Sequence, residues 1–218
     1  MSVLQRAALA GGLVAWLVAI AAGSKFMLDH EFGPGTPSGS PSVWPHGSSV
    51  ARSSELPTLV LFAHPRCPCT RATIAELASL MTQCEGRLAA HVSFYRPKDA
   101  GADWYETDLW RSAALIPGVR VASDPDGAET ERFGATTSGH AALYDPRGNL
   151  LYSGGITSSR GHAGENLGRL TVRDLVLGRD GPRTTLPVFG CALRAPGDHA
   201  GGCRIFDPPR GSYDGGTL

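Results

Sequence analysis

The longest apolar stretch of the chain lies at its N-terminus, where residues 7–24 carry no charge between Arg6 and Lys25. A membrane-spanning helix needs about 20 mainly apolar residues, and this run is long for the core of a signal peptide. The pattern therefore predicts an uncleaved signal-anchor over residues 1–28, with cleavage at the small residues 19–21 as the alternative. Arg6 on the short side keeps the N-terminus in the cytoplasm and places the rest of the chain outside it.

Beyond residue 57 the apolar pattern alternates between strand and helix periods. Continuous or alternating apolar runs predict strands, and apolar residues at helical spacing predict helices. The expected strands cover residues 59–63, 91–95, 119–121, 141–144 and 150–152, and the expected helices cover residues 68–86, 107–115, 126–133 and 164–177. Turn residues 145–149 between the last two strands indicate a hairpin.

The order β-α-β-α-β-α-β-β-α predicts an α/β domain over residues 57–178. Early strand–helix alternation implies parallel strands joined by crossover helices, and the late hairpin adds antiparallel strands. The expected architecture is a mixed central sheet with helices on both faces.

Two segments outside this domain are rich in Gly, Pro and Ser. Residues 29–56 contain runs such as Gly33-Pro34-Gly35 and predict a flexible linker that buries little. Residues 179–218 form a Gly/Pro-rich tail that carries two cysteines.

The composition narrows the function further. Twenty basic residues balance twenty acidic residues, which argues against a nucleic-acid binder. Five cysteines are too few for a disulfide-stapled miniprotein, and their odd number leaves at least one thiol without an intramolecular disulfide.

The candidate chemistry lies where the first strand meets the first helix, at Cys67-Pro68-Cys69. Cys67 as the N-cap and Pro68 as the first helical residue would point the Cys67 sulfur at unpaired N–H groups and the positive end of the helix dipole. Arg66 and a protonated His64 would add positive charge nearby. Each effect favours the thiolate, so Cys67 is the expected attacking thiol.

Three uses of the cysteine pair follow from this placement. Cys67 and Cys69 could form a strained, easily reduced disulfide, both could ligate a soft metal such as Cu(I), or Cys67 could pair with a distant cysteine. For the tail, a Cys191–Cys203 structural disulfide is slightly favoured over the return of Cys191 to the Cys67 site. Cys84 falls in the buried stripe of the first helix and is expected to be a core residue.

The run from Val60 to Cys69, with residues 139–144, Gly148 and residues 153–155, resembles the thioredoxin-like superfamily over about residues 57–178. The pattern His-Pro-x-Cys-Pro-Cys-Thr is most similar to membrane-anchored bacterial proteins of the RedB type. Two departures are plain. The superfamily's Cys-x-x-Cys is Cys67-Pro68-Cys69 here, and Gly139 lies near the place of the usual cis-proline.

This resemblance implies a thioredoxin-like three-layer fold with the loop before His140 beside the cysteines. His140 is then the expected assisting base or metal ligand, and His162 is a weaker candidate. Arg160 could bind a carboxylate or phosphate.

The leading hypothesis is a thiol–disulfide oxidoreductase in the bacterial inner membrane, acting on protein thiols or disulfides outside the cytoplasm. Cys67 would attack, and Cys69 or Cys191 would resolve the mixed disulfide. The alternative is a Cu(I) delivery protein that uses Cys67, Cys69 and His140. A peroxidase ranks third and an adaptor without turnover fourth.

Overall fold

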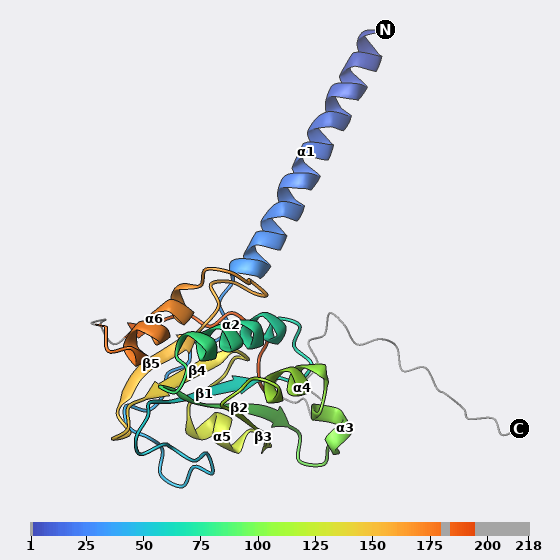
Figure 1. Ribbon diagram of the computed structural model, residues 1–218. Coiled ribbons are helices and arrows are strands. Elements are labelled where there is room, and N and C mark those ends of the chain that lie inside the picture. The colour runs from blue at the N-terminus through green and yellow to red at the C-terminus, as the bar shows by residue number, and fades with distance from the viewer. Residues whose placement is uncertain (1, 180–183, 195–218) are drawn as a thin grey trace, which may run out of the picture.

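The computed structural model describes residues 2–179 and 184–194, and its centre is a six-stranded mixed sheet (Figure 1). The strand order is β3-β2-β1-β4-β5-β6. Strands β1, β2 and β3 run parallel, β4 is antiparallel to β1 and to β5, and β6 pairs in parallel with β5. The strands are β1 Thr58–Ala63, β2 Ala89–Arg96, β3 Val119–Pro125, β4 His140–Tyr144, β5 Leu150–Gly155 and β6 Thr184–Thr185.

Helices cover both faces of this sheet, as the sequence predicts. The helices α2, α4 and α6 lie on one face, and α5 lies on the other (Figure 1). Their bounds are α2 Thr70–Gln83, α3 Ala102–Tyr105, α4 Asp108–Ala114, α5 Ala128–Arg132 and α6 Leu167–Val176. The sequence analysis missed only short elements, the one-turn helix α3 and the two-residue strand β6.

The alternating pattern of β1 divides the core in two. Leu59 and Leu61 point into the larger cluster under α2, while Val60 and Phe62 point into the smaller cluster on the opposite face. All six residues of β1 are buried, which is why the strand reads as a continuous apolar run.

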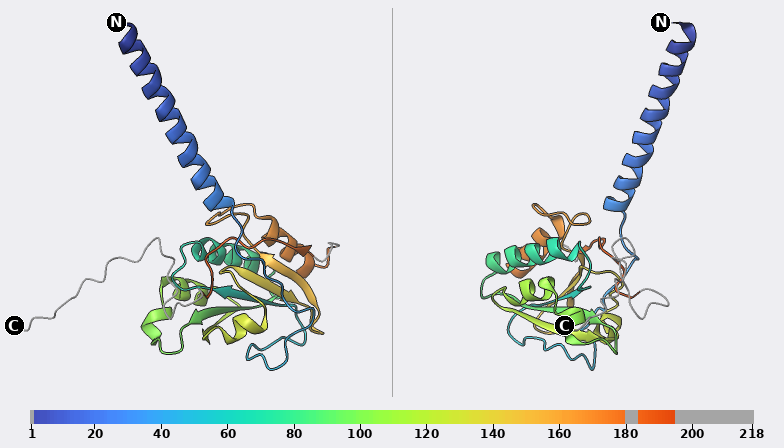
Figure 2. Two further views of the ribbon diagram at one scale, coloured as in Figure 1. Left: turned by 180° about the vertical axis from the view of Figure 1, so that it is seen from behind. Right: turned by 90° about the vertical axis from the view of Figure 1, so that its right-hand side faces the viewer.

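The N-terminal helix α1 (Val3–Phe32) projects away from the domain in every view (Figure 2). Ser2 caps it through a hydrogen bond with the Gln5 backbone N–H. None of its 30 residues is buried, and it is long and apolar enough to cross a membrane. At 1.5 Å per residue its length is about 45 Å.

The segment after α1 differs from the expected flexible linker. Residues 33–56, called the strap below, lie along the sheet face that carries α5. The Trp44 ring packs edge-on against Phe133 and Tyr144, with centroids 5.1 Å away in each case. The Tyr144 hydroxyl donates to the Pro41 carbonyl at 3.0 Å. Proline reduces the conformational freedom of the unfolded strap, and the packing of Trp44 together with hydrogen bonds holds the strap against the domain.

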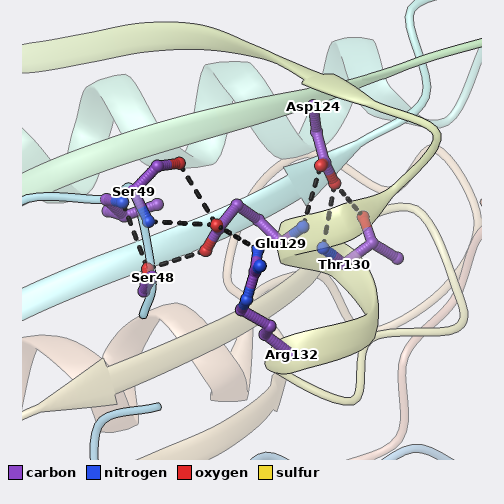
Figure 3. Close-up of polar contacts among 7 residues, drawn as sticks. Ser48, Ser49, Asp124, Glu129, Thr130 and Arg132 are labelled. Atoms are coloured by element: carbon purple, nitrogen blue, oxygen red, sulfur yellow. Dashed lines mark hydrogen bonds and ion pairs between the residues drawn. The ribbon is translucent and has the colours of Figure 1, made fainter. Parts of the chain in front are cut away.

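The middle of the strap is held by the buried carboxylate of Glu129 (Figure 3). This carboxylate accepts hydrogen bonds from the Ser48 hydroxyl at 2.7 Å and from the Ser49 backbone N–H at 3.0 Å, and it pairs with Arg132 at 2.8 Å. Asp124 at the end of β3 accepts from the first backbone N–H groups of α5 and so fixes the helix that carries Glu129. The composition of the strap predicts flexibility, but its residues Ser48 and Ser49 donate specific hydrogen bonds to Glu129.

A buried ion pair joins α2 to α6 on the other face. The Arg169 Nε atom lies 2.6 Å from the Glu76 carboxylate, and both side chains are less than 10% exposed. The same carboxylate accepts the Gly164 backbone N–H at 3.1 Å. The loop between β5 and α6 is thereby fixed against α2.

Candidate functional site

The turn between β1 and α2 places Cys67 differently from the prediction. The first α-helical residue is Thr70 and the N-cap is Cys69, so Cys67 lies two residues before the cap. Bonds of the i→i+3 type, from Thr70 N–H to Cys67 O and from Arg71 N–H to Pro68 O, form a tighter turn ahead of the helix. The predicted Cys67 N-cap with Pro68 in the first helical turn is therefore wrong by one short turn.

Cys67 is also more deeply buried than an attacking thiol was expected to be. It has no exposed surface, whereas Cys69 and Cys191 are half-buried. The Cys67 sulfur lies 2.9 Å from the Cys191 sulfur, within hydrogen-bond distance. Residues separated by 124 positions in sequence thus meet at one point.

The three thiols affect one another's titration. The hydrogen bond with Cys191 and then that with Cys69 lower the pKa of Cys67 against the opposing effect of burial. For Cys69, the hydrogen bond with Cys191 lowers the pKa, but the interaction with Cys67 and burial outweigh it and raise the pKa above its usual value. The pKa of Cys67 is thus lowered, which is the predicted direction, and its largest cause is the hydrogen bond with Cys191.

A C-terminal segment brings Cys191 to this point. Residues 186–194, called the covering segment, run beside the loop that precedes β4. The Ser138 N–H donates to the Cys191 carbonyl at 2.8 Å, and the Leu193 N–H donates to the Thr136 carbonyl at 2.9 Å. The alternative in which Cys191 returns to the Cys67 site matches this geometry. The favoured Cys191–Cys203 disulfide involves Cys203, which lies outside the described residues.

Gly190 allows the close approach of the covering segment. A Cβ atom at this position would lie 2.0 Å from the Ser138 carbonyl oxygen, a distance that no real side chain tolerates. The Arg160 guanidinium donates to the Gly190 carbonyl from the other side. Arg160 therefore binds the backbone of the covering segment here.

The two residues expected to add positive charge near the motif, Arg66 and His64, contact aromatic side chains beside it. The Arg66 guanidinium lies 4.9 Å from the centre of the Trp104 ring. The His64 ring is buried, stacks on Tyr95 and accepts the Arg66 backbone N–H at its Nδ1 atom. The lowered pKa of Cys67 comes from thiol hydrogen bonds, so Arg66 serves to hold this aromatic group together.

The loop before β4 supplies a residue that the sequence analysis missed. The Ser138 hydroxyl accepts the His64 backbone N–H at 2.9 Å and shares a hydrogen bond with the Thr70 hydroxyl at 2.9 Å. Ser138 thereby links β1, α2 and the covering segment. Its position directly before Gly139, the expected substitute for the cis-proline, was the available signal. Gly139 itself has φ +95° and donates its N–H to Phe62.

His140 is not an assisting base for the cysteines. Its Nδ1 atom lies 2.8 Å from the Ser38 hydroxyl and its Nε2 atom lies 2.8 Å from the Ser40 hydroxyl, and both serines belong to the strap. Ser153 adds a contact of 3.3 Å to Nε2. Burial lowers the pKa of His140 to about 4, so the ring is neutral at pH 7.

The copper alternative loses its predicted third ligand through this arrangement, because both ring nitrogens of His140 are hydrogen-bonded to the strap. Over residues 2–179 and 184–194, no group of three or more His, Cys, Asp or Glu side chains has a geometry that could hold a metal ion. His162 is exposed on the β5–α6 loop. The described site is therefore a group of thiols.

No family model matches the chain, and no curated protein matches it. Solved structures do. A hypothetical protein from Sinorhizobium meliloti 1021 superposes with a TM-score of 0.56 at 20% identity, over 74% of this chain and 98% of that one. An uncharacterized conserved protein from Geobacillus kaustophilus gives a TM-score of 0.54 at 17% identity, over 77% of this chain and 96% of that one.

The mixed sheet and the helices on both faces agree with the architecture predicted from the sequence. The chain has the thioredoxin-like fold.

Proposed function

We propose that the protein is a membrane-anchored thiol–disulfide oxidoreductase whose redox couple is Cys67 and Cys191. The contact of 2.9 Å between their sulfurs carries this proposal. The Cys-Pro-Cys motif supplies the nucleophile, and the covering segment supplies the resolving thiol. Cys69 is the third thiol of the group and holds the Cys67 thiolate through its own interaction.

The reaction balances as a two-electron exchange. The Cys67 thiolate attacks a disulfide of the partner protein, which releases one partner thiolate and leaves a mixed disulfide. The Cys191 thiol loses its proton and attacks the Cys67 sulfur, which releases the second partner thiolate. The products are a Cys67–Cys191 disulfide and a partner dithiol, and the reverse sequence oxidises a partner.

Access to Cys67 requires movement of the covering segment, because the sulfur has no exposed surface beneath it. Lifting residues 188–193 exposes the nucleophile and at the same time withdraws the resolving thiol. Return of the segment brings Cys191 back to the mixed disulfide. The hydrogen bonds to Thr136 and Ser138 define the closed position.

The anchor and the compartment follow from α1. A helix of this length and apolarity suits a signal-anchor, with Arg6 on the cytoplasmic side and the domain outside. This is the arrangement of the RedB-type proteins that the motif resembles. A dithiol couple suits that compartment, where disulfides form and persist.

The test is mass-spectrometric mapping of disulfides in protein isolated without reductant. We expect a Cys67–Cys191 linkage in the parent protein and in Cys69→Ser. Recovery of Cys67–Cys69 alone, with Cys191 reduced or paired with Cys203, would overturn the proposed couple. Cys84→Ala serves as the control, since burial raises the pKa of that core thiol and makes it a poor nucleophile.

A further inference from the structure

The end of α1 is attached directly to the thiol site. The Glu31 carbonyl in the last turn of α1 accepts the Arg160 N–H at 3.1 Å. Four residues later the Gly35 N–H donates to the Val188 carbonyl of the covering segment at 2.8 Å. The Arg160 guanidinium in turn holds Gly190, next to Cys191. The expected tether of more than twenty flexible residues between helix and domain is absent from this described region.

Chain geometry places the thiols close to the end of the apolar run. From Lys25 to Gly33 the helix rises about 12 Å. The three residues from Val188 to Cys191 span at most roughly 10 Å. With the two residues from Gly33 to Gly35, the hydrogen bond to Val188 and the cysteine side chain added, the Cys191 sulfur lies within about 35 Å of the level at which the uncharged part of α1 ends.

The last turns of α1 are themselves suited to a membrane surface. Phe26, Met27 and Phe32 are 75%, 70% and 56% exposed, although they follow Lys25, the charge that ends the apolar run. Apolar side chains among charged ones are typical of helix turns in the interfacial region of a bilayer. Leu167, at the start of α6 beyond the Arg160 loop, adds a further apolar side chain that is 62% exposed. These turns would bring the domain close to the lipid headgroups.

We propose that the partner of this site is a membrane-bound protein that presents its disulfide or dithiol close to the bilayer surface. The inference rests on the proposed oxidoreductase function. The strap is held against the domain, and the connection between α1 and the covering segment is short. The thiols therefore stay close to the membrane surface. A cysteine pair held in the same layer has a high effective concentration at the site, and a freely diffusing protein lacks that advantage.

The test uses the full-length protein, reduced and reconstituted in vesicles of phosphatidylcholine and phosphatidylglycerol. The probe is a disulfide-containing peptide anchored to the same vesicles by a lipid chain. Its spacer has about 4 or about 40 Gly/Ser residues, and the longer spacer reaches roughly 35 Å on average. Single-turnover formation of the Cys67–Cys191 disulfide is followed for each probe.

We expect the parent protein to react about tenfold faster with the short-spacer probe than with the long-spacer probe. Insertion of about 20 Gly/Ser residues between Phe32 and Gly33 adds roughly 25 Å of reach and should bring this ratio close to one. The matched control carries the same insertion at Gly86, an exposed turn with open space around it, and should keep the ratio of the parent.

Equal rates of the parent with both probes, or an unchanged ratio after the insertion at Phe32, would overturn the assignment of a membrane-bound partner. The same peptide without its lipid chain separates the two proposals. If the parent oxidises with this soluble peptide but shows no spacer dependence, the oxidoreductase function stands and the partner assignment falls. If it forms no Cys67–Cys191 disulfide with any probe, both fall.

Discussion

Two buried polar clusters lie on either side of Gly139 and behave in opposite ways. Ser138 leads to the thiols, where hydrogen bonds with Cys191 and Cys69 lower the pKa of Cys67. His140 leads to the strap, where serine hydroxyls occupy both of its ring nitrogens and burial keeps it neutral. Both clusters are composed of residue types that catalyse reactions elsewhere. The comparison shows that residue type alone does not set reactivity: the hydrogen bonds of Cys67 favour its ionised form, whereas the burial of His140 favours its neutral form.

The largest effect is expected at the thiols. Cys67→Ser removes the nucleophile and should slow exchange with an unlipidated disulfide peptide by about 100-fold or more. The unfolding free energy should change by only about 1 kcal/mol, because serine fills nearly the same volume. The control Cys84→Ala should lose a similar stability of about 1 kcal/mol but keep the exchange rate of the parent. Exchange by Cys67→Ser at the parent rate would erase the distinction between the clusters.

The burial of His140 should make the unfolding free energy depend on pH. The folded-state pKa of about 4 lies below the ordinary value of 6.5, so the unfolded chain takes up a proton more readily. The stabilisation is fully present above about pH 6.5 and is lost as the pH falls towards 4, by up to about 3 kcal/mol.

Urea unfolding between about pH 7.5 and pH 4.5 measures this loss. His140→Gln should flatten the dependence, while His91, whose pKa burial also lowers, continues to contribute in both proteins. Equal pH slopes for parent and variant would show that His140 titrates as an ordinary surface histidine.

A smaller effect is expected where the strap passes the loop that joins the clusters. A Cβ atom on Gly35 would lie 2.3 Å from the Thr137 hydroxyl oxygen and 2.9 Å from its Cβ atom. Gly35→Ala should therefore lift the strap and cost about 2 kcal/mol in urea unfolding. Gly39→Ala is the matched control, because the space around Gly39 is open. A loss of the same size in both variants would point to backbone flexibility in place of the close contact.

The smallest effect on stability is expected from the loss of a single hydroxyl group, that of Ser38. Ser38→Ala removes one of the hydrogen bonds to His140 and should lower the unfolding free energy by about 1 kcal/mol with no change in exchange rate. Ser42, an exposed strap residue, provides the control substitution to alanine. A change in exchange rate with Ser38→Ala would connect the two clusters chemically and contradict their separation.

The fold was predictable because its elements have strong patterns. The buried run of β1, the helical spacing in α2 and the turn residues of the β4–β5 hairpin each specify a local structure, and their order specifies the mixed sheet. The bounds of α2 were the weak point. Local i→i+3 bonds after Pro68 extend the turn, and a one-turn shift of a helix start leaves no trace in the apolar pattern.

The site was predictable in its nucleophile but not in its partners. The position of Cys67 after a buried strand was visible in the sequence, whereas its contact with Cys191 depends on where a Gly/Pro-rich segment crosses the domain. The role of His140 was missed for a related reason. Ser38 and Ser40 lie in a segment whose composition indicates flexibility, and only the packed structure shows that they bind the ring.

The glycine at residue 190 determines how closely the Cys191 sulfur can approach the Cys67 sulfur. Any larger residue there would hold residues 188–193 away from Ser138 by roughly the radius of a methyl group, about 2 Å. Cys191 would be displaced with its neighbour, and the gap between the sulfurs would exceed bonding reach. A single hydrogen atom in place of a side chain thus determines whether the turn after β1 and the covering segment can be joined by a covalent bond.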